Sequence, residues 1–173
     1  MSDIRFVPAV LNIEFDLVSK NQELFQKEFN RLAHSDEDPV GQWLKLAKAR
    51  GETNESDQVL LTLLVELHRK VDELSAYVKN ERPEFVALSG RGEIDAIGFE
   101  HFRLSKDLLI AGEEYYGRVS MPTFPKREMP LYFSAIDSKT AQIKLLHDQD
   151  EKDWNAYMVA RERVMIRQQR AKK

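Results

Sequence analysis

The most regular hydrophobic pattern in the chain runs from about Glu55 to Asn80, where apolar residues recur at alternating spacings of four and three positions. This spacing is typical of a helix with an apolar seam at the a and d positions of a heptad repeat. Asn54 or Ser56 can cap its start, and Pro83 ends it, because the residue before a proline disfavours the helical conformation. The pattern predicts one long helix whose seam residues are Leu60, Leu64, Leu67, Val71, Leu74 and Val78.

This seam favours self-association of the chain. The first half of the helix is also apolar at Leu61 and Leu63, which flank the seam, and a face this wide indicates more than one packing partner. Burying six seam side chains at roughly 1.5–3 kcal/mol each gives on the order of 10 kcal/mol per chain, which offsets association costs only when partners cover the whole seam. We expect a homo-oligomer, either a dimer or a tetramer; the alternative is a core helix of a monomeric domain.

Two further helices precede this one. A helix is predicted over residues 14–34, and one of its faces carries phenylalanines. Such a face would be a large exposed apolar patch, so other residues must cover it, most simply those of the long helix or of its copies. Pro39 suits the first turn of a shorter helix that Gly51 ends. The aromatic residues of the first face are Phe15, Phe25 and Phe29.

After Pro83 the hydrophobic period falls from 3.6 to about two, which is typical of β-strands. Glycines break the stretch 84–104 into a strand, a turn and a strand, and further strands are predicted at 115–121, 131–137 and 140–146. The acidic stretch from His147 to Asp153 has a capping-box-like spacing and begins a last helix that runs to about Arg170.

These elements predict an α+β protein with two parts. Residues 1–83 form a helical oligomerisation arm with the long heptad helix, and residues 84–173 form a small antiparallel β-barrel closed by a C-terminal helix.

The composition of the chain limits its cellular location and its classes of partner. The chain has 173 residues, a formal charge of −3 and no cysteine, which excludes a disulfide framework and fits a reducing cytoplasm. No apolar run approaches the ~20 residues that span a bilayer, and no overall basicity indicates nucleic acid. Charge is uneven, however: Arg161–Lys173 carries six basic residues and one acidic residue, either as a solvated helix end or as an anion-binding tail.

Several pieces of the C-terminal half resemble one bacterial family, the PilZ domain. They are Ile97-Gly98-Phe99-Glu100, the strand AGEEYYGRVSMP and the ending DEKDWNAYMVARERVMIRQQR. The resemblance covers residues 84–170 and implies a six-stranded barrel-like module with a C-terminal helix. A PilZ module with a long heptad helix is similar to the atypical, tetramer-forming members of that family.

The family's ligand is cyclic di-GMP, which it binds with R-x-x-x-R in a flexible lead-in and [D/N]-x-S-x-x-G on the barrel. This sequence departs from both motifs. Ala87 replaces the acid or amide before Ser89, the rival alignment at Asp95 has no serine, and the only R-x-x-x-R is Arg163–Arg167, at the wrong end of the domain. If the ligand binds, the resemblance assigns it to Arg82, Ser89, Arg91, Asp95 and Gly98.

Other chemistry has little support in the sequence. The four histidines lack the spacing of a zinc helix, and the carboxylates after His147 lack EF-hand spacing, so we expect no metal site. Ser89 lies between apolar and glycine residues without the strand–turn–helix order of a nucleophile elbow, and we expect no catalytic residues.

The sequence therefore leads to a non-enzymatic PilZ-like adaptor that oligomerises, binds protein partners and needs no cofactor. By family resemblance it would act in the cytoplasm in bacterial motility, through the flagellum or type IV pili. The alternatives are a cyclic di-GMP effector, in which the ligand reorients barrel and arm, and an enzyme of unknown type.

Overall fold

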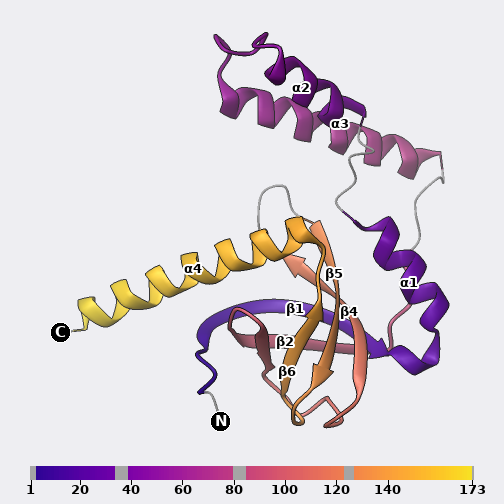
Figure 1. Cartoon of the computed structure of the whole chain (residues 1–173), viewed down its shortest axis with the longest axis vertical. Coiled ribbons are helices and arrows are strands. Elements are labelled where there is room, and N and C mark those ends of the chain that lie inside the picture. Colours follow the sequence, from indigo (N-terminus) through magenta and orange to yellow (C-terminus); the bar gives the residue numbers. More distant parts are fainter. Residues whose placement is uncertain (1–2, 34–38, 80–84, 123–126, 173) are drawn as a thin grey trace. The chain divides into compact units, whose positions relative to one another are not determined.

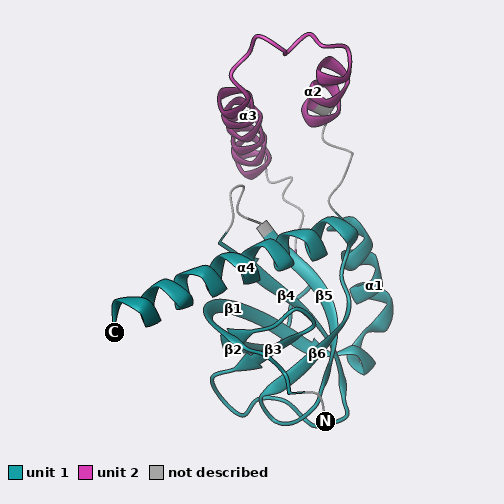
Figure 2. Ribbon diagram, turned by 60° about the vertical axis from the view of Figure 1, so that its left-hand side comes forward, with its two compact units in different colours: residues 1–34, 86–173 teal, residues 35–85 magenta. Residues whose placement is uncertain are grey.

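A computed structural model describes residues 3–33, 39–79, 85–122 and 127–172. The chain forms two compact units, one of residues 1–34 and 86–173 and the other of residues 35–85 (Figure 2). Each unit is described separately below. No helix in the described ranges is long and apolar enough to cross a membrane.

The first unit is a β-barrel whose strands are all paired antiparallel (Figure 1). Within the described residues six strands close the barrel in the order β1-β2-β3-β6-β5-β4. Their bounds are β1 Val7–Leu17, β2 Gly90–Ile97, β3 His101–Leu104, β4 Glu114–Met121, β5 Arg127–Ala135 and β6 Thr140–Leu145.

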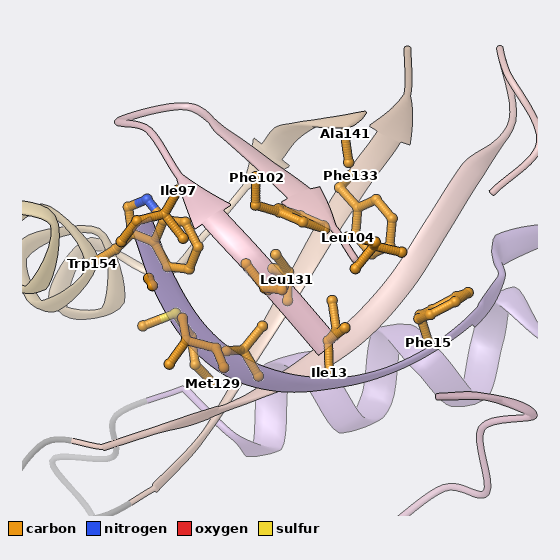
Figure 3. Close-up of a cluster of buried hydrophobic side chains, with 14 of the residues drawn as sticks. Ile13, Phe15, Ile97, Phe102, Leu104, Met129, Leu131, Phe133, Ala141 and Trp154 are labelled. Atoms are coloured by element: carbon orange, nitrogen blue, oxygen red, sulfur yellow. The ribbon is translucent and has the colours of Figure 1, made fainter. Parts of the chain in front are cut away.

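Alternation of apolar and polar residues builds the barrel interior. Along β1, the residues Val7, Ala9, Leu11, Ile13 and Phe15 are buried, while Pro8, Val10 and Asn12 between them are exposed. Side chains from the other strands meet them inside, among them Ile97, Phe102, Leu131 and Phe133 (Figure 3). Because successive strand residues point to opposite faces, one such face of each strand is sufficient to fill the core.

A long helix, α4 (Asp148–Ala171), supplies two further core residues. Trp154 and Met158 lie one turn apart on the helix and are both buried with the barrel interior (Figure 3). The Trp154 indole donates a hydrogen bond of 2.8 Å to the carbonyl of Gly98, which satisfies its only polar group.

A short helix packs on the outer face of the barrel. The chain leaves β1 through a 3-10 turn, η1 (Val18–Lys20), and enters α1 (Gln22–Arg31), which Asn21 caps by accepting from the Leu24 amide. Phe25 stacks on Tyr116 at 5.1 Å between ring centroids. These contacts form a second hydrophobic cluster, which contains Phe25, Phe29, Leu88 and Tyr116.

The second unit contains two helices, α2 (Pro39–Ala49) and α3 (Gln58–Val78) (Figure 1). Gly51 ends the first with φ of 76°, a left-handed conformation that favours glycine. Asp57 caps α3 by accepting from the amides of Val59 and Leu60. The sequence-based choice of Asn54 or Ser56 as the cap is therefore wrong.

The structure divides the chain differently from the expected 1–83 and 84–173. Residues 7–17 are a barrel strand and not part of a helical arm, so the helical unit is an insertion between β1 and β2. The prediction of a helix over 14–34 is wrong for Glu14–Leu17, which continue β1, and the helix itself starts at Gln22.

The expected cover for the phenylalanine face is also corrected. Phe15 lies inside the barrel, and Phe25 and Phe29 pack on its outer face against residues of β4, β5 and the segment before β2. The residues that bury them belong to the first unit. The capping-box prediction for the last helix is wrong as well, because His147 takes the N-cap position without a side-chain hydrogen bond.

Candidate functional site

The most unusual surface among the described residues is one apolar face of α3. All six residues of the sequence-predicted seam are exposed, from 53% for Leu64 to 73% for Val78. Leu63 and Tyr77, which flank the seam, are about half exposed at 49% and 54%. The full set of large apolar side chains exposed on this helix is Val59, Leu60, Leu63, Leu64, Leu67, Val71, Leu74, Tyr77 and Val78.

The other helix of this unit does not cover that face. Helix α2 buries Leu44 and Ala47. On α3, Glu66 is buried and Leu61 and Val65 are half-buried, and these three residues lie on a different face from the seam. Buried Glu66 pairs with Arg69 at 3.1 Å on the same helix. The α2 contact therefore orients α3 and leaves the seam open to water.

An open face of this size favours a macromolecular interface. Single exposed apolar residues are common on protein surfaces, whereas a contiguous apolar stripe on a 21-residue helix marks an interaction site. The helix cap at Asp57 and the ion pair between Lys70 and Glu73 stabilise α3 without using the seam. The arrangement can bind an apolar partner along the helix, and it carries no reactive group.

The residues expected for cyclic di-GMP begin at the start of β2. The Ser89 amide donates to Asp16 at 3.2 Å, and its hydroxyl accepts from Lys20 at 3.0 Å. Burial raises the pKa of the Asp16 carboxyl, but the hydrogen bonds from Lys20 and Ser89 outweigh it and lower the pKa overall. Arg91 is exposed and pairs with Glu14 at 3.2 Å. Both residues therefore have internal partners.

The remaining expected ligand residues have other roles. Asp95 pairs with Arg103 at 2.8 Å across the sheet. The Gly98 carbonyl accepts from Trp154, and a Cβ at Gly98 would lie 2.9 Å from the carbonyl of Arg5. Arg82 lies outside the described residues.

The four described positions do not converge on one pocket. Ser89 precedes β2 and Gly98 follows it, so at about 3.3 Å per residue they lie roughly 30 Å apart along the strand. Arg91 and Asp95 lie between them, each with its own acid or base partner. The structure gives this set structural roles that need no ligand.

A buried polar cluster that the sequence analysis missed joins α1 to the barrel. The Glu28 carboxylate accepts from Arg118 at 2.5 Å, from the Tyr116 hydroxyl at 2.8 Å and from the Val86 amide at 2.5 Å. Arg118 also donates to Glu14 at 3.0 Å. The signal in the sequence is Glu28 itself, a carboxylate three residues after Phe25 on the apolar face of its helix.

Burial and the charges of the cluster together shift the pKa values of Tyr116 and Arg118. Burial and the adjacent Glu28 carboxylate both raise the pKa of Tyr116 far above its ordinary value. Burial lowers the pKa of Arg118, but the bonds to Glu28 and Glu14 outweigh it and raise the pKa overall. Glu28 and Arg118 are enclosed while Glu14 is partly exposed, and the cluster is suited to anchoring α1 to the barrel.

No metal site is visible in the part of the chain that the structure describes. No group of three or more histidine, aspartate or glutamate side chains is close enough there to hold an ion. The carboxylates after His147 lie along the first turns of α4, and the His147 ring stacks on Phe29 at 3.9 Å.

Comparisons with known proteins leave the family open. No family model matches the chain, and neither a curated protein nor a solved structure is similar to it.

Proposed function

We propose that the chain is a non-enzymatic, PilZ-like adaptor that self-associates through α3 and presents its barrels to protein partners. The observation that carries the proposal is the exposed apolar seam of α3, which α2 leaves uncovered. By resemblance to the PilZ family, the adaptor would serve bacterial surface motility, through the flagellum or type IV pili.

The heptad spacing supports a second copy of the chain as the occupant of this seam. The d positions are leucines and two of the three a positions are valines, a combination found in parallel coiled coils. The apolar flanks at Leu63 and Tyr77 widen the face toward a four-helix contact. Both a dimer and a tetramer therefore agree with the pattern.

The barrel supports the PilZ-like part of the proposal at a coarser level. It is a closed antiparallel barrel of six described strands with a C-terminal helix, the architecture that the resemblance implies. An adaptor is favoured over a cyclic di-GMP effector, because the four described residues expected to bind that ligand are spread along β2 and its ends and have internal partners.

A charge placed in the seam tests the proposal. Leu67→Asp introduces a carboxylate at the middle d position, and we expect it to lower the mass of the assembly in light scattering, because burying an unpaired charge is costly. Thr62→Asp is the matched control, since Thr62 is exposed on the opposite side of the same helix. Equal masses for the Leu67→Asp variant and the unmodified chain would remove α3 as the interface.

A further inference from the structure

The C-terminal half of α4 carries a stripe of exposed arginines. Arg163, Arg167 and Arg170 are spaced by four and three residues, so they lie within about 60° of one another around the helix. The opposite side of the same helix carries Trp154 and Met158, which are buried in the barrel. The three arginines, here called the α4 arginine stripe, therefore face away from the unit's core, where the helix runs past the barrel (Figure 1).

The neighbouring charges do not neutralise this stripe. Arg161 donates to the carbonyl of Pro8, and Glu162 pairs with Arg5, so both are engaged toward β1 and the segment before it. No acidic residue follows Glu162 in the chain. Among the described residues, no ion pair or hydrogen bond engages a side chain of the stripe.

The acidic start of α4 is too far away to compensate. Its last carboxylate, Asp153, precedes Arg163 by ten residues, which is about 15 Å along a helix. At physiological ionic strength the screening length is about 8 Å. The stripe is therefore a local positive surface on a chain whose formal net charge is −3.

The residues around the stripe favour one kind of anionic partner. Val164 and Ile166 are half-buried on either side of it, and the exposed Lys172 at the helix end lies outside the stripe. No large apolar or aromatic side chain is exposed on α4 to anchor a protein interface. A protein that binds duplex DNA through six to ten phosphate contacts uses at least twice as many contacts as the three arginines of the stripe can make singly. Anionic lipid headgroups need only clustered charge on a helix face.

We propose that the α4 arginine stripe binds the anionic headgroups of a lipid bilayer surface by charge, without insertion into the bilayer. One chain offers a small number of cations, so its binding is weak. The location of the lipid-binding site does not depend on the self-association proposed above. The strength of membrane attachment does, because an assembly presents several arginine stripes to one bilayer surface.

Vesicle sedimentation with the full chain tests this site. The probes are vesicles of phosphatidylcholine alone and vesicles in which about one third of the lipid is phosphatidylglycerol. We expect binding to the second kind only, weakening as salt rises because exposed charges are screened. Binding to both kinds alike, or to neither, would overturn the proposal.

Charge-matched variants locate the effect. The triple variant Arg163→Glu, Arg167→Glu and Arg170→Glu should bind anionic vesicles about tenfold less tightly, or weaker still. The control triple Lys27→Glu, Lys106→Glu and Lys144→Glu changes the net charge equally at exposed positions elsewhere in the same unit and should stay within about twofold of the unmodified chain. Equal losses in both triples would show general repulsion and contradict a site on α4.

An arginine-to-lysine triple at the same three positions distinguishes charge from shape. We expect it to keep vesicle binding, because headgroup attraction depends on charge, whereas paired hydrogen bonding to an acidic protein needs the guanidinium fork. Loss of binding in this variant, or displacement from anionic vesicles by equimolar duplex DNA, would contradict the lipid proposal.

Light scattering on the same protein preparations, without vesicles, separates the self-association proposal from the lipid proposal. If the chain is monomeric and still binds anionic vesicles, the self-association proposal is refuted and the lipid proposal stands. If the chain assembles but does not bind anionic vesicles, the lipid proposal is refuted and the self-association proposal stands. If both hold, the Leu67→Asp variant should bind vesicles through the same arginines, but more weakly.

Discussion

Glu28 and Arg118 are almost completely removed from water and lie in direct contact. Glu28 comes from α1 and Arg118 from β4, so their ion pair fixes a helix to the barrel. Tyr116 and the Val86 amide complete the bonding of the Glu28 carboxylate. A buried carboxylate with this many donors is costly to disturb, because removing its charge leaves the arginine under-compensated.

We expect Glu28→Gln to reduce the free energy of unfolding by about 3 kcal/mol, since it breaks a buried ion pair without changing the side-chain volume. Urea denaturation of the full chain measures the loss. The control is Glu23→Gln on the same helix, where the exposed pair with Lys27 should contribute nothing measurable. Equal stability of the Glu28→Gln variant and the unmodified chain would show that the pair is not what holds α1 in place.

Alkaline pH should destabilise the first unit. Burial raises the pKa of Tyr116 above 10, and it also raises the pKa values of Tyr132 and Tyr157. The unfolded tyrosines lose their protons near pH 10 while the folded ones retain them, so stability is intact below pH 10 and falls as pH rises beyond it. Urea midpoints between pH 8 and 11 measure this slope, and Tyr116→Phe should flatten it; a slope unchanged in that variant would contradict the assignment to Tyr116.

Individual residues show where sequence reasoning reached its limit. Glu28 lies on the apolar face of its helix in the sequence, and only the long-range contact of α1 with β4 shows that Arg118 meets it. The role of Gly98 was equally hidden, because its carbonyl is satisfied by Trp154, 56 residues later. Local patterns cannot supply partners that the fold brings from distant segments.

At the scale of elements, the sequence of β1 contains the two-residue hydrophobic period of a strand, which the sequence analysis did not use. Its residues alternate between buried and exposed over most of their length, as a half-buried strand should. The helical spacing of the phenylalanines overlaps its last residues and favoured a helix there. By contrast, the strands after residue 90, the two helices of the second unit and the last helix were predicted near their observed positions, since one period dominates each of them.

The pairing of β1 with β2 depends on a close approach at Gly90. A Cβ there would lie 2.6 Å from the Phe15 ring and 2.8 Å from the Phe15 carbonyl. We expect Gly90→Ala to destabilise the barrel by about 1–3 kcal/mol through overpacking, as measured by denaturation.

Gly92 provides the matched control on the same strand. A Cβ at Gly92 would meet the Leu108 side-chain end at 3.0 Å, and that side chain can move. Gly92→Ala should therefore cost clearly less than Gly90→Ala. Equal costs would mean that a general loss of glycine in β2, and not the contact with Phe15, sets the effect.

At the scale of the whole molecule, the barrel and the helical unit have separate roles in the proposed function. The barrel has a closed core and a buried ion pair between Glu28 and Arg118, while the helical unit exposes its apolar seam. The seam was read from the sequence, because heptad spacing depends on local positions alone. The location of the seam on an insertion between two barrel strands could not be predicted from the sequence, because it depends on the pairing of β1 with β2 and β4.

Cyclic di-GMP should not bind this chain. Of the positions expected to hold it, the four that the structure describes, Ser89, Arg91, Asp95 and Gly98, are distributed along one strand and its ends, and each has an internal partner. Isothermal titration of the full chain with cyclic di-GMP should give no heat beyond dilution. A saturable heat, weakened by Arg91→Ala, would restore the effector hypothesis.

The mass of the unmodified chain in solution tests the central claim most directly. Multi-angle light scattering, across a dilution series at physiological salt, compares it with the 20.1 kDa of one chain. We expect twice or four times that mass, because we propose that another copy covers the exposed seam of α3. A mass of 20.1 kDa at every concentration would contradict self-association through α3.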